Sequence, residues 1–151
     1  MANEFVLAID PGLLTGMLLA DIKDPMNPFP VWFKEAPVEE FYQTIDQTIP
    51  SLAGNLEVVL ENYIITARTA KLAQAPWSLR GYGAVQFLCM KYGVPFTHQS
   101  PSDAKTFVDN QKLHTVGFWY KGGEGHANDA ARHFVKYHSD SYPKWTKKLL
   151  V

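Results

Sequence analysis

The fold is decided by residues 5–12, which read FVLAIDPG. Five consecutive apolar residues, 5–9, predict a strand that is buried on both faces, because a sheet covered by helices leaves no solvent side for polar residues. Asp10 ends this run, and the proline and glycine that follow favour a tight turn. Such a strand is typical of a sheet flanked by helices, so we expect an α/β fold.

The rest of the chain continues in strands and helices. The predicted strands cover residues 5–9, 15–20, 31–33, 56–60 and 95–98, and the first three would form an antiparallel meander. The predicted helices cover residues 38–49, 78–92, a stretch that begins at Ser100-Pro101, and 126–138. Pro50 is expected to end the first helix, Ser78 to cap the second and Gly93 to close it. With the last two helices, which follow one another, counted together, the predicted order is βββαβαβα.

Length and composition indicate one domain over residues 1–151. The chain is 46% hydrophobic and 19% charged, which is enough apolar material for a core and too much for disorder. No apolar run approaches the ~20 residues of a membrane span, and the acidic start at residues 1–4 does not resemble a signal peptide. Cys89 is the single cysteine, so we exclude an intramolecular disulfide and expect a buried thiol. These features predict a cytoplasmic protein without a membrane partner.

The net charge of −1 conceals an uneven distribution. Residues 1–60 contain two basic and nine acidic side chains, whereas residues 61–151 contain twelve basic and six acidic ones. Such a split suggests that the second part contacts a polyanion, although halves of a sequence need not be faces of a fold.

Two acidic residues end buried strands. Asp10 follows the first apolar run, and Glu61 follows the run at 56–60. A carboxylate at such a position is costly unless it is paired or binds a cation, and neighbouring strands would bring the two together at one sheet edge. The alternative is that each acid is a solvated strand end, or that Asp10 only holds the turn before Gly12.

The last predicted helix contributes a third polar group. His126 and Asp129 lie three residues apart and therefore on one helical face, and small residues at 127, 130 and 131 would allow close packing on a sheet. His133, one turn after Asp129, is a further candidate. In isolation, Asp129 could equally offset the helix dipole, and His126 could be an ordinary residue of the first turn.

Three motifs together resemble the RuvC-type Holliday-junction resolvases of the RNase H-like (retroviral-integrase) superfamily. The segment AIDPGLLTG at residues 8–16 resembles their first-strand motif, VVLEN at 58–62 their second acidic motif, and HANDAA at 126–131 their last-helix motif. The resemblance covers roughly residues 5–138. It implies a mixed five-stranded RNase H-like sheet flanked by helices, and a single nuclease domain over residues 1–151.

The resemblance assigns Asp10, Glu61 and Asp129 as metal-binding catalytic carboxylates. His126 stands where relatives carry either an acid or a histidine, and it is included in the ligand and catalytic set. Carboxylates suit Mg²⁺ or Mn²⁺, and two such ions per site would activate a water and stabilise the leaving oxygen of a cleaved phosphodiester.

The resemblance also suggests DNA contacts and partners. SPSDAK at residues 100–105 is similar to a helix start of the family, which makes Lys105 a candidate for catalysis and for phosphate contact. The other DNA-binding candidates are Arg68, Lys71, Arg80 and Lys112. The implied partners are a four-way junction or other branched DNA and a second copy of the chain, in the cytoplasm of a bacterium or a phage-infected host. The small size would suit a phage enzyme of recombination or repair.

The chain departs from the family at two places. The run Phe118-Trp119-Tyr120 stands in a stretch where a basic, glycine-rich turn is usual. These aromatic residues would either pack in a core or dimer interface, or stack on bases of an opened junction. Ile64-Ile65 follows Glu61 where relatives often carry an aromatic wedge, so junction specificity is less firmly predicted than nuclease chemistry.

We interpret the chain as a structure-specific endodeoxyribonuclease that resolves Holliday junctions or other branched DNA by two-metal-ion hydrolysis. One alternative is a junction-binding architectural protein with a weakened site, because His126 replaces an acid. Another is a 3′–5′ exonuclease on a related fold, which is disfavoured because Gly12 stands where that family needs an acid. An actin-like nucleotide binder is disfavoured because 151 residues leave no second lobe.

Overall fold

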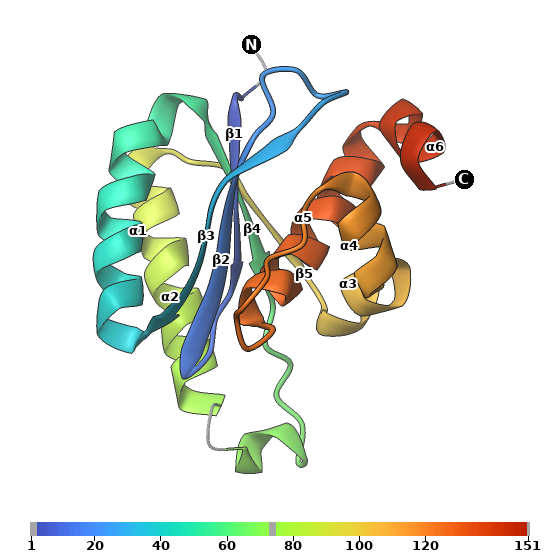
Figure 1. Ribbon diagram of the computed structural model, residues 1–151. Helices are drawn as coiled ribbons and strands as arrows, with labels where there is room; N and C mark the ends of the chain where they lie inside the picture. Colours follow the sequence, from blue (N-terminus) through green and yellow to red (C-terminus); the bar gives the residue numbers. More distant parts are fainter. Residues whose placement is uncertain (1–2, 73–74, 151) are drawn as a thin grey trace.

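The computed structural model describes residues 3–72 and 75–150, which form a five-stranded mixed sheet with helices on both faces (Figure 1). The strands are β1 (Phe5–Asp10), β2 (Leu14–Asp21), β3 (Phe29–Pro37), β4 (Leu56–Glu61) and β5 (Phe96–Gln99). Their order across the sheet is β3-β2-β1-β4-β5. The first three strands are antiparallel neighbours, and β4 runs parallel to both β1 and β5. The α/β class and the antiparallel meander are confirmed; the ends of the predicted domain, residues 1–2 and 151, lie outside the described residues.

The helices divide between the two faces of the sheet. Their bounds are α1 (Val38–Leu52), α2 (Ala75–Tyr92), α3 (Pro101–Phe107), α4 (Asn110–Val116), α5 (His126–Ser141) and α6 (Pro143–Leu150), with short 3₁₀ turns η1 (Ala53–Asn55) and η2 (Thr69–Lys71). In Figure 1, α1 and α2 lie on one side of the sheet and α3 to α6 on the other. No helix in residues 3–72 and 75–150 is both long and apolar enough to cross a membrane.

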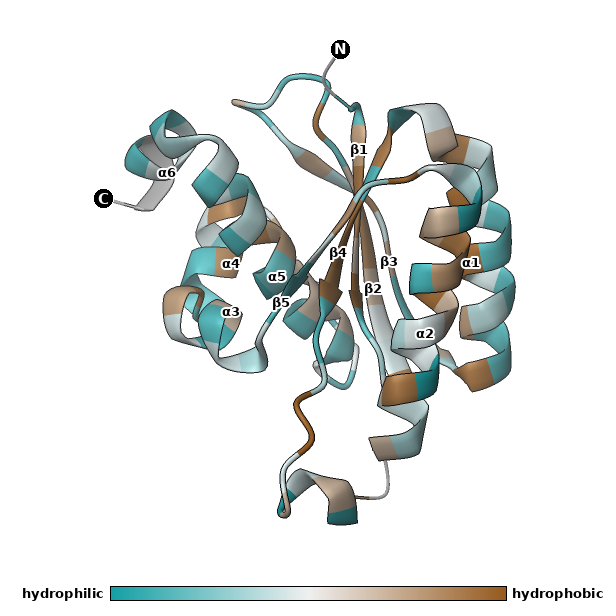
Figure 2. Cartoon of the chain, turned by 180° about the vertical axis from the view of Figure 1, so that it is seen from behind, coloured by the Kyte–Doolittle hydropathy of each residue, from teal (hydrophilic) through white to brown (hydrophobic). Residues whose placement is uncertain are grey.

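Strand alternation directs β1 into both cores. Leu7 and Ile9 pack into the core beneath α1 and α2, whereas Val6 and Ala8 pack into the core beneath α5. Asp10 is next in the second series, so its side chain falls on the α5 face where the strand ends. In Figure 2 the central strands β1 and β4 are coloured mostly hydrophobic, as expected for strands covered on both faces.

Several predicted boundaries are wrong. β3 covers nine residues instead of three, because it pairs with β2 along its whole length. α1 continues past Pro50 to Leu52, since a proline in the last turn removes only one intrahelical hydrogen bond. Ser78 does not cap α2, which begins at Ala75; its hydroxyl donates a hydrogen bond to the carbonyl of Pro11 at 3.0 Å.

Two helices, α4 and α6, were not predicted. α4 nevertheless has recognisable ends, because the Asp109 side chain accepts a hydrogen bond from the N–H of Lys112 and Gly117 adopts a positive φ of 80°. α6 is docked by Trp145, which is 1% exposed and packs edge-on against His138. Short helices of this kind depend on tertiary packing more than on their own periodicity.

The aromatic run after α4 packs within the chain. Phe118 is fully buried in the core under α5. Tyr120 stacks on Phe33 with 5.1 Å between ring centroids, and Trp119 stacks on His114 at 4.5 Å. Of the two interpretations of this run, intramolecular packing is therefore the one that the contacts favour.

Cys89 lies in the core beneath α1 and α2, where it is 1% exposed. Burial raises the pKa of its thiol to about 12. The prediction of a buried thiol is confirmed, and the raised pKa disfavours the reactive thiolate form.

Candidate active site

Two carboxylates lie next to each other at one edge of the sheet. β1 and β4 are parallel neighbours in which Ile9 pairs with Leu60, so the following residues, Asp10 and Glu61, stand together at the carboxyl ends of the strands. The bond from Ser78 to Pro11 fastens the turn after Asp10 to α2. The two acids that end buried strands in the sequence therefore lie together in the structure, as predicted.

The first turn of α5 brings His126 and Asp129 to the same place. Both line a pocket of about 150 Å³ together with Asp10, Glu61 and Lys105. The helix approaches the sheet closely because β2 carries Gly16 at the contact: a Cβ there would lie 1.9 Å from the carbonyl oxygen of His126. A larger residue at this position would push the helix start away from the strand ends.

A side chain from β3 takes the place of a helix cap. Gly125 precedes α5 and has no side chain to cap it. Glu35 instead accepts hydrogen bonds from the backbone N–H groups of Glu124 at 2.6 Å and Ala127 at 2.8 Å. Partial burial opposes ionisation of Glu35, but these hydrogen bonds, with the nearby His126, outweigh it and lower the pKa of the carboxyl. Glu35 therefore fixes the start of α5, a role that sequence reasoning missed because its partners are backbone groups about 90 residues away.

Burial and neighbouring negative charge both act on the Asp10 carboxyl. Burial raises its pKa well above the ordinary value, and the charges of Glu61 and Asp129, with a hydrogen bond to Glu61, raise it further. The positive charge of Lys105 acts in the opposite direction. Because like charges in a partly buried pocket repel until something neutralises them, the pocket favours a proton or a cation.

The donor set fits a hard divalent cation. Carboxylate oxygens are the ligands that Mg²⁺ and Mn²⁺ prefer, and three carboxylates reach this pocket. His126 adds a nitrogen donor at the same place. Within the part of the chain that the structure describes, no three histidine, cysteine, aspartate or glutamate side chains are already drawn together as a metal-ligand group. The residues suit the predicted ions in type and location. To bind an ion, their side chains must move closer to one another.

Glu61 is also held by a histidine from α5. Nε2 of His133 lies 2.6 Å from Oε2 of Glu61, and Nδ1 lies 2.9 Å from Oε1 of Gln99. Sequence reasoning named His133 only as a further candidate and missed Gln99. The signal for Gln99 was present, because it ends β5 and pairs in register with Glu61 at the end of β4.

The predicted basic residues occupy different surroundings. Lys105, on α3, is exposed and lines the pocket. The guanidinium of Arg80 lies over the Trp77 ring, 4.8 Å from its centroid. Lys112 does not reach the pocket, and its Nζ donates a hydrogen bond to the carbonyl of Phe107 at 2.6 Å.

Two further basic candidates, Arg68 and Lys71, are exposed on the segment between β4 and α2. This segment projects beyond the ends of β1 and β4 (Figure 1). On α5, Nε of Arg132 lies 3.8 Å from Oδ1 of Asp129 and its Nη2 donates to Asn110. Lys105 therefore lines the pocket itself, and Arg132 pairs with one of the acids that line it.

Comparison with solved structures identifies the fold. T. thermophilus RuvC in complex with a Holliday junction substrate matches with a TM-score of 0.70 and 13% sequence identity, over 92% of this chain and 96% of that one. The chain has the RuvC-type resolvase fold. A second Thermus thermophilus RuvC structure gives a TM-score of 0.66 at 16% identity over the same shares. The yeast mitochondrial Holliday junction resolvase Ydc2 gives 0.59 at 12% identity, over 98% of this chain and 85% of that one. No protein-family model and no curated protein matches the chain.

The RuvC-type fold explains where the pocket lies. Its central parallel strands, β1 and β4, end beside the first turn of α5 in this chain. The pocket therefore forms where three elements meet, and the RNase H-like architecture that the three motifs predicted is confirmed.

Proposed function

We propose that this protein is a structure-specific endodeoxyribonuclease that resolves Holliday junctions or other branched DNA by metal-dependent phosphodiester hydrolysis with two ions per site. The observation that carries the proposal is the meeting of Asp10, Glu61 and Asp129 in one pocket, beside Lys105, on a RuvC-type fold. Support for a branched substrate comes from the similar RuvC structure, which holds a Holliday junction substrate.

The pocket residues divide into cation ligands and a phosphate contact. Asp10, Glu61 and Asp129 would hold Mg²⁺ or Mn²⁺, with His126 as an additional donor. When bound, such ions supply an activated water and stabilise the leaving oxygen of an in-line displacement. Lys105 is exposed on the same pocket, so it can neutralise a phosphate oxygen of the strand being cut.

The segment between β4 and α2 extends this surface toward the DNA. Tyr63, just after β4, and Ser78, on α2, line the pocket. Arg68 and Lys71, between β4 and α2, and Arg80, on α2, are exposed and would contact backbone phosphates, whereas Lys112 would contact DNA only away from the pocket.

Two exposed isoleucines on this segment suggest how a junction is opened. Ile64 is 49% exposed and Ile65 61% exposed, and the segment is coloured as hydrophobic in Figure 2. Apolar side chains of this kind act as wedges between bases in proteins that distort DNA. We assign Ile64-Ile65 this role beside the cleaved strand.

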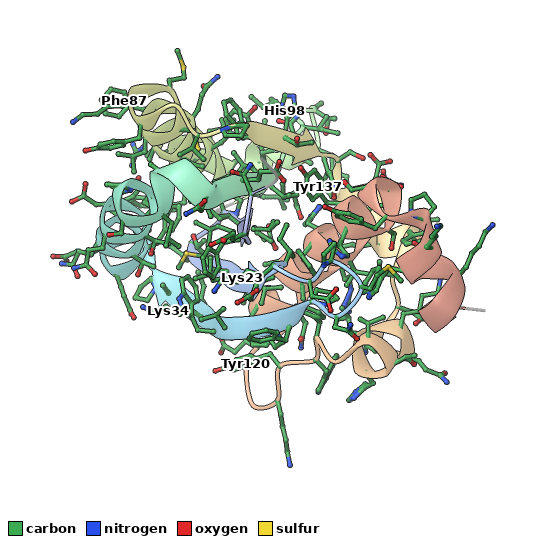
Figure 3. The ribbon with its side chains drawn as sticks, turned by 90° about the horizontal axis from the view of Figure 1, so that it is seen from above. Lys23, Lys34, Phe87, His98, Tyr120 and Tyr137 are labelled. Atoms are coloured by element: carbon green, nitrogen blue, oxygen red, sulfur yellow. The ribbon has the colours of Figure 1, made fainter. Side chains whose placement is uncertain are left out.

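A homodimer would place two such sites on one junction. α2 carries an exposed apolar stripe in which Leu79, Phe87 and Met90 are 41%, 63% and 72% exposed. Phe87 lies at the outer edge of the molecule in Figure 3. Gly83 stands on the same stripe and a Cβ there would meet no atom within 4 Å, so the backbone is open to close approach by a second α2. Two sites related by a two-fold axis would match the symmetry of a four-way junction.

A junction-binding architectural protein is the second candidate. It is favoured by one specific observation, namely that the described side chains are not already arranged as a metal-ligand group. His126 in place of an acid points in the same direction.

Cutting of a labelled four-way junction tests the proposal. The junction and a linear duplex of the same sequence are incubated with the protein in Mg²⁺, in Mn²⁺ and in chelator. We expect paired nicks on opposite strands of the junction in metal, little cutting of the duplex, and none in chelator. Binding without cutting under every metal condition would favour the architectural protein, and stepwise loss of nucleotides from duplex ends would favour an exonuclease.

Sedimentation tests the proposed dimer interface. We expect the 17.0 kDa chain to sediment as a dimer and the Phe87→Lys variant to sediment as a monomer.

A further inference from the structure

We infer that His133 and Gln99 form a buried support that positions Glu61 to receive a cation. The inference rests on the proposed metal site, but it concerns two residues that lie behind that site and outside the three motifs that resemble the family.

The three side chains come from three elements that converge. Glu61 ends β4 and Gln99 ends β5, and these two residues are paired in register. Neighbours paired in a parallel sheet direct their side chains to the same face, here the one covered by α5. His133 descends from α5 between them, 2.6 Å from Glu61 and 2.9 Å from Gln99. Its side chain is 1% exposed, while that of Glu61 keeps 14% exposure toward the pocket.

The hydrogen-bond chemistry fixes the ring and the carboxylate together. In the ionised form that binds a cation, Glu61 can only accept, so Nε2 of His133 donates to its Oε2. The carboxamide of Gln99 carries a donor as well as the acceptor Oε1 that faces Nδ1, so by turning over it can pair with Nδ1 whether or not that nitrogen carries a hydrogen. The separation of 2.6 Å is short for an N–H···O hydrogen bond, in keeping with a charged acceptor.

The consequence for the site is that one oxygen of Glu61 is held by His133 while the carboxylate still lines the pocket. With Oε2 held, Oε1 remains available to an incoming cation. A glutamate at a strand end has several rotamers, and fixing one of them removes the entropy that would otherwise oppose ligation. Partners behind a metal ligand contribute about 10–100-fold to metal affinity or activity in other proteins.

The test measures Mn²⁺ binding by calorimetry, without DNA, on the whole chain. His133→Phe should weaken binding about 10–100-fold. His133→Gln places an amide N–H near the position of Nε2 and should recover most of the affinity, whereas His133→Asn reaches only toward the position of Nδ1 and should not. Tyr137→Phe is the matched control, because its hydroxyl also donates to an acid on the same face of β4, Glu57, at 2.7 Å. This control should bind Mn²⁺ as the unaltered protein does.

The outcomes separate this inference from the proposed function. Equal affinity in His133→Phe and the unaltered protein, or equal losses in His133→Gln and His133→Asn, would overturn the inference while the metal site stands. If the unaltered protein binds no Mn²⁺, the proposed metal mechanism fails and the support has no cation to serve. If His133→Phe does not fold, ¹⁵N spectra of the unaltered protein decide: we expect an exchange-protected hydrogen on Nε2 of His133, and a bare Nε2 would overturn the inference.

Discussion

The two halves of α5 each contain one buried histidine, and the two rings serve different surroundings. His133, in the first half, reaches the carboxylate of Glu61 at 2.6 Å. His138, in the second half, has Nε2 2.7 Å from the carbonyl oxygen of Pro25 and packs against the aromatic rings of Phe134, Tyr142 and Trp145. Both residues are 1% exposed. Burial alone therefore does not distinguish the two histidines. What distinguishes them is the group that each ring faces, which is a strand-end carboxylate only for His133.

The difference follows from where each half lies over the sheet. The first half covers the carboxyl ends of β1 and β4, where Asp10 and Glu61 stand. The second half contributes Phe134 and Val135 to the core between α5 and the sheet, and it docks α6 through His138. Tyr137 lies between α5 and the sheet (Figure 3), and its bond to Glu57 is a structural counterpart of the His133 pair. One helix thus builds the site with one half and the core with the other.

Asp10→Asn is expected to have the largest effect. Loss of one anionic ligand removes several kcal/mol of transition-state stabilisation, so junction cutting should fall about 10³-fold while junction binding persists. Because the folded pKa of Asp10 is raised, its ionisation destabilises the folded state as pH rises above the ordinary value of about 3.9. Without metal, the variant should therefore melt at a higher temperature than the unaltered protein at pH 8. A less stable variant at that pH would mean that Asp10 is a structural residue.

Gly16→Ala tests the close packing of the first half of α5 against β2. A methyl group 1.9 Å from the His126 carbonyl cannot be accommodated without displacing the helix, and overpacking of this kind costs about 1–3 kcal/mol. Urea unfolding should show this loss, together with reduced cutting. The matched control is Gly54→Ala, because a Cβ at Gly54 meets nothing within 4 Å. Equal stability of the two variants would contradict the close approach of α5 to β2.

Glu35→Gln tests the hydrogen bonds that Glu35 accepts from backbone N–H groups at the start of α5. The substitution should lower the free energy of unfolding by about 1 kcal/mol at neutral pH. The folded pKa of Glu35 is lowered, so its contribution is present above the ordinary value of about 4.3 and disappears as pH falls through the lower folded value. Urea unfolding between pH 3 and 7 should show the two proteins converging at the acid end. Stability curves that stay parallel across this range would exclude a role for the Glu35 charge.

His138→Phe, in the second half, should have the smallest effect. Burial lowers the pKa of His138, so the unaltered protein loses stability as pH falls below the ordinary value of about 6.5, where the unfolded chain binds the proton more readily. The phenylalanine variant should lack this loss and should cut junctions normally at pH 8. Impaired cutting at pH 8 would remove the distinction between the two halves of α5.

The sequence predicted those parts of the site that depend on local pattern. Strand-end acids at Asp10 and Glu61 follow uninterrupted apolar runs, and the spacing of His126 and Asp129 places them on one face of a helix. Parallel pairing of β1 and β4 then brings these residues together. The five strands and the helices α1, α2, α3 and α5 were predictable for the same reason, because apolar runs, helical periodicity and capping residues are local properties.

The supporting contacts were not predictable in this way. Glu35 acts on backbone groups about 90 residues later, and Gln99 acts through a ring that belongs to another element. Ser78 looked like a helix cap because serine favours that position, yet its hydroxyl serves the Pro11 carbonyl across 67 residues. Long-range partners of this kind appear only when the strands and helices are in place.

The most direct test of the central claim, that the first half of α5 completes a cation site with the two strand-end acids, is anomalous diffraction from a crystal soaked in Mn²⁺. We predict manganese density in the pocket, within bonding distance of carboxylate oxygens of Asp10, Glu61 and Asp129. Manganese bound elsewhere on the chain, or no manganese in this pocket at a concentration that supports cutting, would contradict the account.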